Sequence, residues 1–276
     1  MTDKTLIQSR EGNMKKGIIA AASLALALAG CSGGTPAASD GDHLARIQKA
    51  GKIVVGLEGD WQPFCFHDAS DTLVGFDVEV AQNIAKKLGV EIEIIETPWD
   101  TLFTAMTQGQ LDMVVNGVDV TPDRQQTYDF SDPYAYDHTV LVVRSDETEI
   151  ATFEDLDGKT TANSIGSTYM EIGESYGATV QGVDTLAETM TMVLQERVDA
   201  TINAETSVQD YLKTTGEKGV KVVDRSADAT SYAIPLVKGD DNATFLEAIN
   251  KALAELKAEG VLTDISNKYF GSDLTK

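Results

Sequence analysis

The chain has 276 residues, 42% of them hydrophobic and 24% charged, which is a globular composition with room for one large domain or two medium ones. Its formal net charge is −22, so it repels polyanions, and this excludes nucleic acid as a partner and electrostatic attraction to anionic lipid. Its two cysteines are Cys31 and Cys65. We interpret Cys65 as a buried residue at a strand end, because no second cysteine remains in the expected mature domain to form a disulfide.

The N-terminus has the pattern of a secretory signal. A basic segment at 14–16 precedes an apolar stretch at 17–29 that is too short for a membrane span, and residues 28–31 (LAGC) resemble a bacterial lipobox. We therefore expect a signal peptide at 1–30 with an N-terminal extension at 1–13, lipidation of Cys31, and a flexible tether at 31–42. The expected location is extracytoplasmic, held to the cell membrane by the lipid anchor. The alternatives are a plain secretory signal with an incidental cysteine, or a cytosolic protein with an apolar start.

Short Val- and Ile-rich runs alternate with segments of helical period from residue 52 onward, which predicts βαβ units around a mostly parallel sheet. The first group of predicted elements is a strand at 52–57, a helix at 76–88, a strand at 91–96, a helix at 100–108, and strands at 111–115 and 139–143. The second group has strands at 160–162, 179–183, 200–202 and 220–223, an extended segment at 232–237, and helices at 168–176, 185–196, 204–214, 243–258 and 261–269. The pattern therefore predicts an α/β protein with two lobes.

Several motifs then occur in a specific order. They are VGLEGDWQPF at 55–64, GFDVE at 75–79, DMVVNG at 112–117, TPDR at 121–124 and YDFSDPY at 128–134. In this order they closely resemble the polar amino-acid solute-binding proteins of ABC importers, bacterial solute-binding protein family 3, and the resemblance extends over about 44–271. The segments TPWD at 97–100, 186–199 and 270–276 look most like the cystine-binding members.

The resemblance implies a type II periplasmic-binding-protein-like fold, with two Rossmann-like lobes joined by two hinge crossings. Lobe 1 would comprise 43–136 plus 234–276, and lobe 2 would comprise 137–233. The implied function is that of a monomeric binding lipoprotein that closes around a small amino acid and delivers it to an ABC permease in the membrane. No cofactor or metal is expected.

A free amino acid carries an anion and a cation on one carbon, so its pocket must supply a partner for each charge. Arg124 matches the arginine of the family's Thr-x-x-Arg motif, and a guanidinium pairs with a carboxylate through two hydrogen bonds. Ser167 and Thr168 follow a glycine where a strand leads into a helix, so we expect backbone N–H groups there to face the same carboxylate.

The resemblance also implies walls and a floor for the pocket. Trp61 and Trp99 match positions that enclose the ligand side chain, although either tryptophan could be ordinary core. Asn116 and Gly117 follow a buried strand and match a segment that offers a side chain and a carbonyl to the ligand; the plain alternative is a strand-ending turn.

One departure concerns the ligand ammonium. The family usually places an aspartate where this chain has Ala204, so another carboxylate must take its place. Asp119 is the first candidate, because the family usually has a Ser or Thr there that also reaches the ammonium, and Glu205 is the second.

Two other classes of function remain open. The fold is shared by enzymes that resemble cyclohexadienyl dehydratases, and the loss of the aspartate at Ala204 keeps that alternative open. An amino-acid-sensing domain is the other. No catalytic residues are predicted, because no nucleophile–base pair is visible and the three histidines (His43, His67 and His138) stand at unrelated places.

Overall fold

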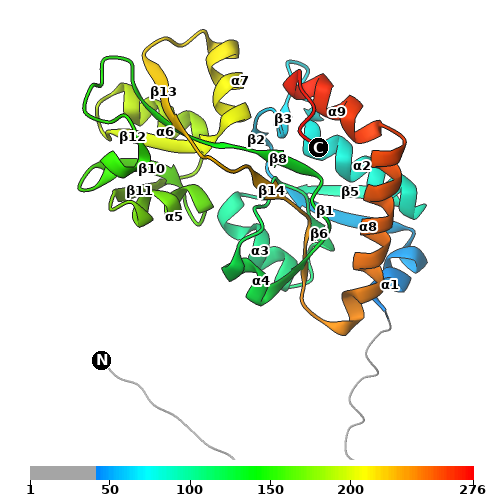
Figure 1. The fold of residues 1–276 in the computed structure, drawn as a ribbon. Helices are drawn as coiled ribbons and strands as arrows, with labels where there is room; N and C mark the ends of the chain where they lie inside the picture. The colour runs from blue at the N-terminus through cyan, green and yellow to red at the C-terminus, as the bar shows by residue number, and fades with distance from the viewer. Residues whose placement is uncertain (1–41) are drawn as a thin grey trace, which may run out of the picture. The chain divides into compact units, whose positions relative to one another are not determined.

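The computed structural model describes residues 42–276. The predicted signal peptide, Cys31 and the tether up to residue 41 lie outside the described residues. Within the described part, the chain forms two separate principal sheets with helices packed on them (Figure 1). We call the parts built on these sheets the first lobe and the second lobe.

The first lobe is built on a parallel sheet of three strands. Strand β1 (Lys52–Leu57) lies between β5 (Glu91–Glu96) and β6 (Met113–Val114). Alternate side chains of β1 point to opposite faces, as a strand requires. Ile53, Val55 and Leu57 join the main core, whereas Val54 packs with the cluster around α3 (Trp99–Thr107).

Helices from both ends of the chain cover this sheet on the side of the main core. They are α1 (His43–Ala50), α2 (Phe76–Leu88), α8 (Ala243–Ala258) and α9 (Val261–Phe270), and α8 follows the short 3-10 helix η2 (Asp240–Asn242). Helix α2 contacts both α8 and α9 (Figure 1). The first lobe is therefore completed by the last part of the sequence.

Two antiparallel strand pairs lie where the chain passes between the lobes. Strand β7 (Tyr128–Phe130) pairs with β15 (Pro235–Val237), and β8 (Ala135–Asp137) pairs with β14 (Thr230–Tyr232). A small antiparallel sheet of β2 (Asp60–Trp61), β3 (Cys65–His67) and β4 (Leu73–Val74) precedes α2. Helix α4 (Pro122–Thr127) is capped by Thr121, whose hydroxyl accepts from the Arg124 N–H.

The second lobe contains a sheet of five strands in the order β11-β10-β12-β9-β13. These strands are β9 (Thr139–Arg144), β10 (Thr160–Ser164), β11 (Thr179–Val183), β12 (Ala200–Ala204) and β13 (Val220–Arg225). Its helices are the 3-10 helix η1 (Phe153–Leu156), α5 (Thr168–Ser175), α6 (Leu186–Leu194) and α7 (Glu205–Thr215).

One strand of the second lobe departs from the expected mostly parallel sheet. Strand β9 runs antiparallel to both β12 and β13, so two of the sheet's four pairings are antiparallel. The physical reason is the crossing between the lobes. Strands β8 and β14 are antiparallel to each other, and β9 and β13 continue them into the second lobe in opposite directions.

Predicted and observed elements agree closely where the hydrophobic period is long. The helices predicted at 76–88 and 243–258 have these bounds, as do the strands at 52–57, 91–96 and 179–183. The predicted strand at 111–115 is reduced to β6, and residue 204 ends β12 instead of starting a helix. Helices α1 and α4 and the short strands β2, β3, β4, β7 and β8 were not predicted.

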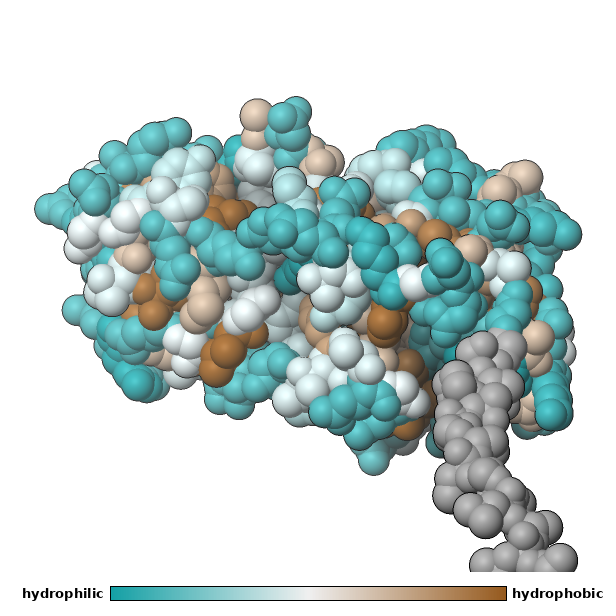
Figure 2. All heavy atoms as spheres, turned by 90° about the horizontal axis from the view of Figure 1, so that it is seen from below, coloured by the Kyte–Doolittle hydropathy of each residue, from teal (hydrophilic) through white to brown (hydrophobic). Residues whose placement is uncertain are grey.

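The described surface is mainly hydrophilic. On the face shown in Figure 2, teal residues cover most of the molecule and hydrophobic residues form separate small areas. Among residues 42–276, no helix is both long enough and apolar enough to span a bilayer.

Candidate functional site

Two adjoining cavities are lined by residues of both lobes. The outer cavity has a volume of about 460 Å³. The inner cavity lies beside it, and both are lined by Glu58, Asp60, Trp99, Ser164, Asp184 and Thr185. The residues that line only the inner cavity are Trp61, Asn116, Gly117, Asp119, Ser167, Thr168, Tyr169, Leu186 and Asn203. Seven predicted ligand-binding residues therefore come together at the inner cavity: Trp61, Trp99, Asn116, Gly117, Asp119, Ser167 and Thr168.

The inner cavity has an aromatic wall on the first lobe. The Trp61 ring stacks on Phe64 with ring centroids 4.2 Å apart, and Phe64 is fully buried. Trp61 also lies against Gly117, whose φ is +52°, and a Cβ at this glycine would be 2.5 Å from a Trp61 ring atom. Only glycine allows both this conformation and this contact.

The Asn116 side chain is already bonded to protein groups. Its Oδ1 accepts from the Glu58 backbone N–H at 2.8 Å and from the Cys65 thiol at 3.2 Å, and its Nδ2 donates to Glu58 Oε2 at 2.7 Å. Asn116 therefore orients Glu58 at the junction of the two cavities. Burial raises the pKa of Glu58 to about 7, and the Asn116 hydrogen bond opposes this rise.

Asp119 lies between the lobes and is buried. Its Oδ2 accepts a short hydrogen bond from the Thr168 hydroxyl of the second lobe and lies 3.8 Å from Arg124 Nη1. Burial raises the pKa of Asp119 to about 6, against the opposing effects of Thr168 and Arg124. A buried anion with one nearby cation and one hydroxyl donor still has capacity for a ligand ammonium.

The Arg124 guanidinium packs against two aromatic rings and donates to a backbone carbonyl. Its guanidinium carbon lies 5.3 Å from the ring centroids of both Trp99 and Phe103, and Nη1 donates to the Asp119 carbonyl at 3.2 Å. Its side chain is only 11% exposed. The two aromatic faces leave the guanidinium edge available for hydrogen bonds. Arg124 does not itself line either cavity but lies directly behind Asp119 and Trp99.

The second lobe presents the start of helix α5 to the inner cavity. Ser167 is the N-cap: its hydroxyl accepts from the Met170 N–H at 3.2 Å and donates to the Ser164 carbonyl at 2.7 Å. Ser164 and Thr185 lie at the carboxyl ends of the parallel strands β10 and β11, and the predicted Ser167 and Thr168 follow the first of these. The carboxyl edge of a parallel sheet is where α/β proteins bind ligands.

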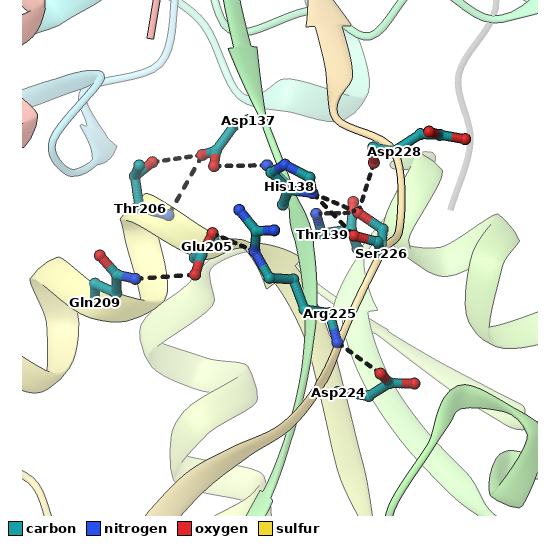
Figure 3. A network of polar contacts seen from close by, with 10 residues as sticks. All are labelled: Asp137, His138, Thr139, Glu205, Thr206, Gln209, Asp224, Arg225, Ser226 and Asp228. Carbon is teal, nitrogen blue, oxygen red and sulfur yellow. Dashed lines mark hydrogen bonds and ion pairs between the residues drawn. The ribbon is translucent and has the colours of Figure 1, made fainter. Parts of the chain in front are cut away.

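Glu205, the second candidate for the ligand ammonium, lies apart from both cavities. Its carboxylate bonds to Arg225 Nε at 2.7 Å and to Gln209 Nε2 at 3.1 Å, in the network of Figure 3, and it lines neither cavity. In the same network, Asp137 accepts at 2.6 Å from the hydroxyl of Thr206, which lies at the start of α7. Ala204 is fully buried, and its neighbour Asn203 lines the inner cavity instead.

Sequence reasoning missed eight residues that line the inner cavity. These are Glu58, Asp60, Ser164, Tyr169, Asp184, Thr185, Leu186 and Asn203. Glu58, Ser164, Asp184, Thr185 and Asn203 could have been found by listing the polar residues at the carboxyl ends of the predicted parallel strands. Asp60 lies in the short strand β2, and Tyr169 and Leu186 lie on helices, so their places at the cavity depend on packing.

The lining is strongly acidic. Six carboxylates line the outer cavity, namely Glu58, Asp60, Glu96, Asp100, Asp184 and Glu188, and no Lys, Arg or His from the described residues lines either cavity. Burial also raises the pKa of Asp60. The outer cavity therefore favours a positively charged group.

Comparison with known proteins decides the family. The model of the bacterial extracellular solute-binding proteins, family 3, matches residues 53–272. This chain belongs to that family. A solute-binding protein similar to it is the L-cystine-binding protein TcyA of Bacillus subtilis, 40% identical over 95% of this chain and 100% of TcyA.

Two solved structures show the same two-lobed, type II binding-protein fold. An ancestral arginine-binding protein bound to arginine has a TM-score of 0.74 at 35% identity, covering 80% of this solute-binding protein and 99% of that chain. The L-cystine receptor of Neisseria gonorrhoeae, unliganded and open, has a TM-score of 0.58 at 37% identity, covering 86% and 100%.

Proposed function

We propose that the chain is the substrate-binding lipoprotein of an amino-acid ABC importer and that it binds a polar L-amino acid, with cystine or cysteine as the first candidates. The observation that carries this proposal is the neighbouring pair Asp119 and Arg124: a buried anion that lines the inner cavity, with a buried cation 3.8 Å behind it. A zwitterion needs both charges side by side in a dry site. The similarity to the cystine-binding protein TcyA supports the choice of cystine.

The proposed mechanism is closure of two lobes on the ligand. Arg124 pairs with the ligand carboxylate and Asp119 with its ammonium, while Trp61 and Trp99 enclose the side chain. Ser167 and Thr168 complete the carboxylate site when the lobe at 137–233 closes on the lobe at 43–136 plus 234–276. A ligand that contacts both lobes stabilises the closed form, which the permease then receives.

The outer cavity favours a second candidate, a basic amino acid such as arginine. Its six carboxylates suit a cationic side-chain end, whereas the far half of cystine also carries a carboxylate, and no cation from the described residues lines the cavity to receive it. An arginine-bound ancestral protein is among the similar structures. Cystine and arginine therefore make different demands on the same cavity, and one binding panel separates them.

We expect the purified domain at 42–276 to melt at a higher temperature with one or a few L-amino acids from a panel that includes cystine, cysteine, arginine and lysine. A ligand bound only by the folded state adds about 2.7 kcal/mol at a hundredfold excess over its Kd. The measurement is a thermal melt at pH 7.5, followed by chromatography showing that the ligand is recovered unchanged. No shift with any amino acid would contradict the transport function, and a converted ligand would indicate an enzyme.

The proposed lipid anchor has its own test. Cys31→Ala in the full chain, expressed in a bacterium that processes lipoproteins, is expected to move the protein from the membrane fraction to the soluble extracytoplasmic fraction. The chain's charge of −22 supplies no alternative attraction to anionic lipid. Cys65→Ala is the matched control, since this thiol is buried in the domain and should leave membrane attachment unchanged. Membrane retention of the Cys31→Ala protein would refute lipidation at this site.

A further inference from the structure

The inner cavity depends on the placement of one turn. Asn116 and Gly117 follow strand β6, line the cavity, and bring the chain against the Trp61 ring at the left-handed Gly117 conformation. Asn116 in turn fixes Glu58 through two hydrogen bonds and accepts a third from the Cys65 thiol. A small displacement of this turn would therefore shift the cavity lining at Asn116 and Gly117, the Trp61 ring and Glu58 together.

A buried pair of side chains holds this turn from the side away from the cavity. The Gly117 N–H donates to the Tyr134 phenol oxygen at 3.1 Å, and the Tyr134 O–H donates to Asp77 Oδ1 at 2.9 Å. Asp77 is 0% and Tyr134 1% exposed, and neither lines the inner or outer cavity. The phenol oxygen thus links a carboxylate at the start of α2 to the backbone of the ligand pocket.

Packing alone does not explain these polar groups. The Tyr134 ring stacks on Phe76 at 5.9 Å, a contact that phenylalanine would preserve, and Asp77 Oδ2 is buried without a hydrogen-bond partner. Burying such a carboxylate opposes folding unless it is fully bonded. Burial raises the pKa of Asp77 to about 7. The hydroxyl and the carboxylate are therefore explained better by the position they give to Gly117 than by core stability.

We propose that Asp77 and Tyr134 are positioning residues for ligand binding, which act by fixing the Asn116–Gly117 turn. This inference rests on the proposed function, because it concerns the same pocket. In this proposal, Asp77 and Tyr134 contribute to amino-acid affinity without contacting the ligand. It also gives the GFD segment at 75–77 a role in recognition, since Asp77 stands at the start of α2 behind the cavity floor.

The decisive variant is Tyr134→Phe. It removes one oxygen, keeps the ring packing, and leaves both the Gly117 N–H and Asp77 Oδ1 without their partner, so the turn should relax and amino-acid affinity should fall by at least about tenfold. The matched control is Tyr269→Phe. It also deletes a tyrosine-to-carboxylate hydrogen bond in the first lobe, from Tyr269 to Glu79 at 2.6 Å, but lies outside both cavities. This control should bind normally.

The probe is whichever amino acid gives the largest melting shift with the wild-type domain, and affinity is measured by calorimetry. Asp77→Asn keeps an oxygen that can accept from Tyr134, so its affinity should stay within about threefold of wild type, whereas Asp77→Ala should resemble Tyr134→Phe. A purely structural role predicts a different pattern, in which the melting temperature falls while affinity is kept. Wild-type affinity in Tyr134→Phe would overturn the proposal.

A readout without ligand separates this inference from the proposed function. In the amide NMR spectrum of the ligand-free domain, the Gly117 proton should shift upfield in Tyr134→Phe and stay in place in Tyr269→Phe. An unchanged Gly117 resonance would overturn the positioning role. Suppose that no amino acid binds the wild type while the Gly117 resonance shifts as expected. The contact between Tyr134 and the turn is then confirmed, whereas the proposed function fails, and with it the role of Asp77 and Tyr134 in ligand binding.

Discussion

Arg124→Ala is expected to abolish measurable amino-acid binding while leaving the domain folded. The variant leaves the ligand carboxylate in a dry cleft without its main partner, which costs roughly 3–5 kcal/mol, or more than a hundredfold in affinity. The Arg124 side chain packs against two aromatic rings and donates to the Asp119 backbone carbonyl. Because these contacts lie outside the main core, the substitution should leave the main core intact. Calorimetry and a circular dichroism spectrum check the two parts of this expectation.

Two companion variants sharpen the result. Arg124→Lys keeps the charge but loses the planar pair of donors, so it should recover only part of the affinity. Arg144→Ala removes an arginine that pairs with Asp146 on the second lobe and lines neither cavity, so it should bind as wild type does. If Arg124→Ala binds nearly normally and retains a native spectrum, Arg124 is not the carboxylate partner.

Amino-acid binding is expected to weaken as the pH falls below about 6. Burial raises the pKa of Asp119 to about 6 in the ligand-free protein, and only the ionised form can pair with an ammonium. Affinity should therefore be nearly constant above pH 7 and should fall by up to about tenfold per pH unit well below 6. Calorimetry at several pH values between 5 and 8 measures this profile.

The Asp119→Asn variant tests the assignment. It should bind at least about a hundredfold more weakly at pH 7.5, because the ammonium is left without its anion, and the inflection near pH 6 should disappear. Asp137→Asn is a matched control, since burial also raises the pKa of Asp137 to about 6 but this residue lines neither cavity. Its pH profile should keep the inflection. A normal profile in Asp119→Asn, or a lost one in Glu205→Gln, would place the ammonium partner elsewhere.

Stability of the ligand-free protein should move in the opposite direction. Glu58, Asp77, Asp119 and Asp137 all have folded-state pKa values that burial raises above their unfolded values. The stability they contribute is complete at low pH and is lost as the pH rises through about 6 to 7. Weaker binding at pH 5.5 with an unchanged or higher melting temperature therefore points to titration of the pocket and not to unfolding.

The sequence predicts the parts of the molecule that depend on periodic burial. The long helices α2 and α8 and the buried strand β1 have the predicted bounds because one face of each packs in the core. Most of the candidate site residues also meet at one cavity, because motifs that follow the parallel strands of both sheets lie at the carboxyl ends of those strands. The family order of motifs added Arg124 and Asp119, which no periodicity would single out.

What the sequence could not predict depends on contacts between distant segments. The two-residue strands β2 and β4 have no period to detect, and β9 runs antiparallel only because of the way the chain crosses between the lobes. Glu205 was a candidate because of its position in the sequence. Its carboxylate instead pairs with Arg225, which lies in a strand twenty positions later, and the sequence does not show that contact. Asn116 likewise matched a binding motif, although its side chain is occupied by Glu58 and Cys65.

The pairing of β7 with β15, and of α2 with α8 and α9, has a consequence for biogenesis. The second lobe's sheet is made from one continuous stretch of chain, so it can form as soon as β13 is available. The first lobe must keep the apolar face of α2 uncovered until the final helices arrive. During synthesis, the first part of the domain to be made is therefore the last to be finished, and it depends on the last helices of the chain for its protection from aggregation.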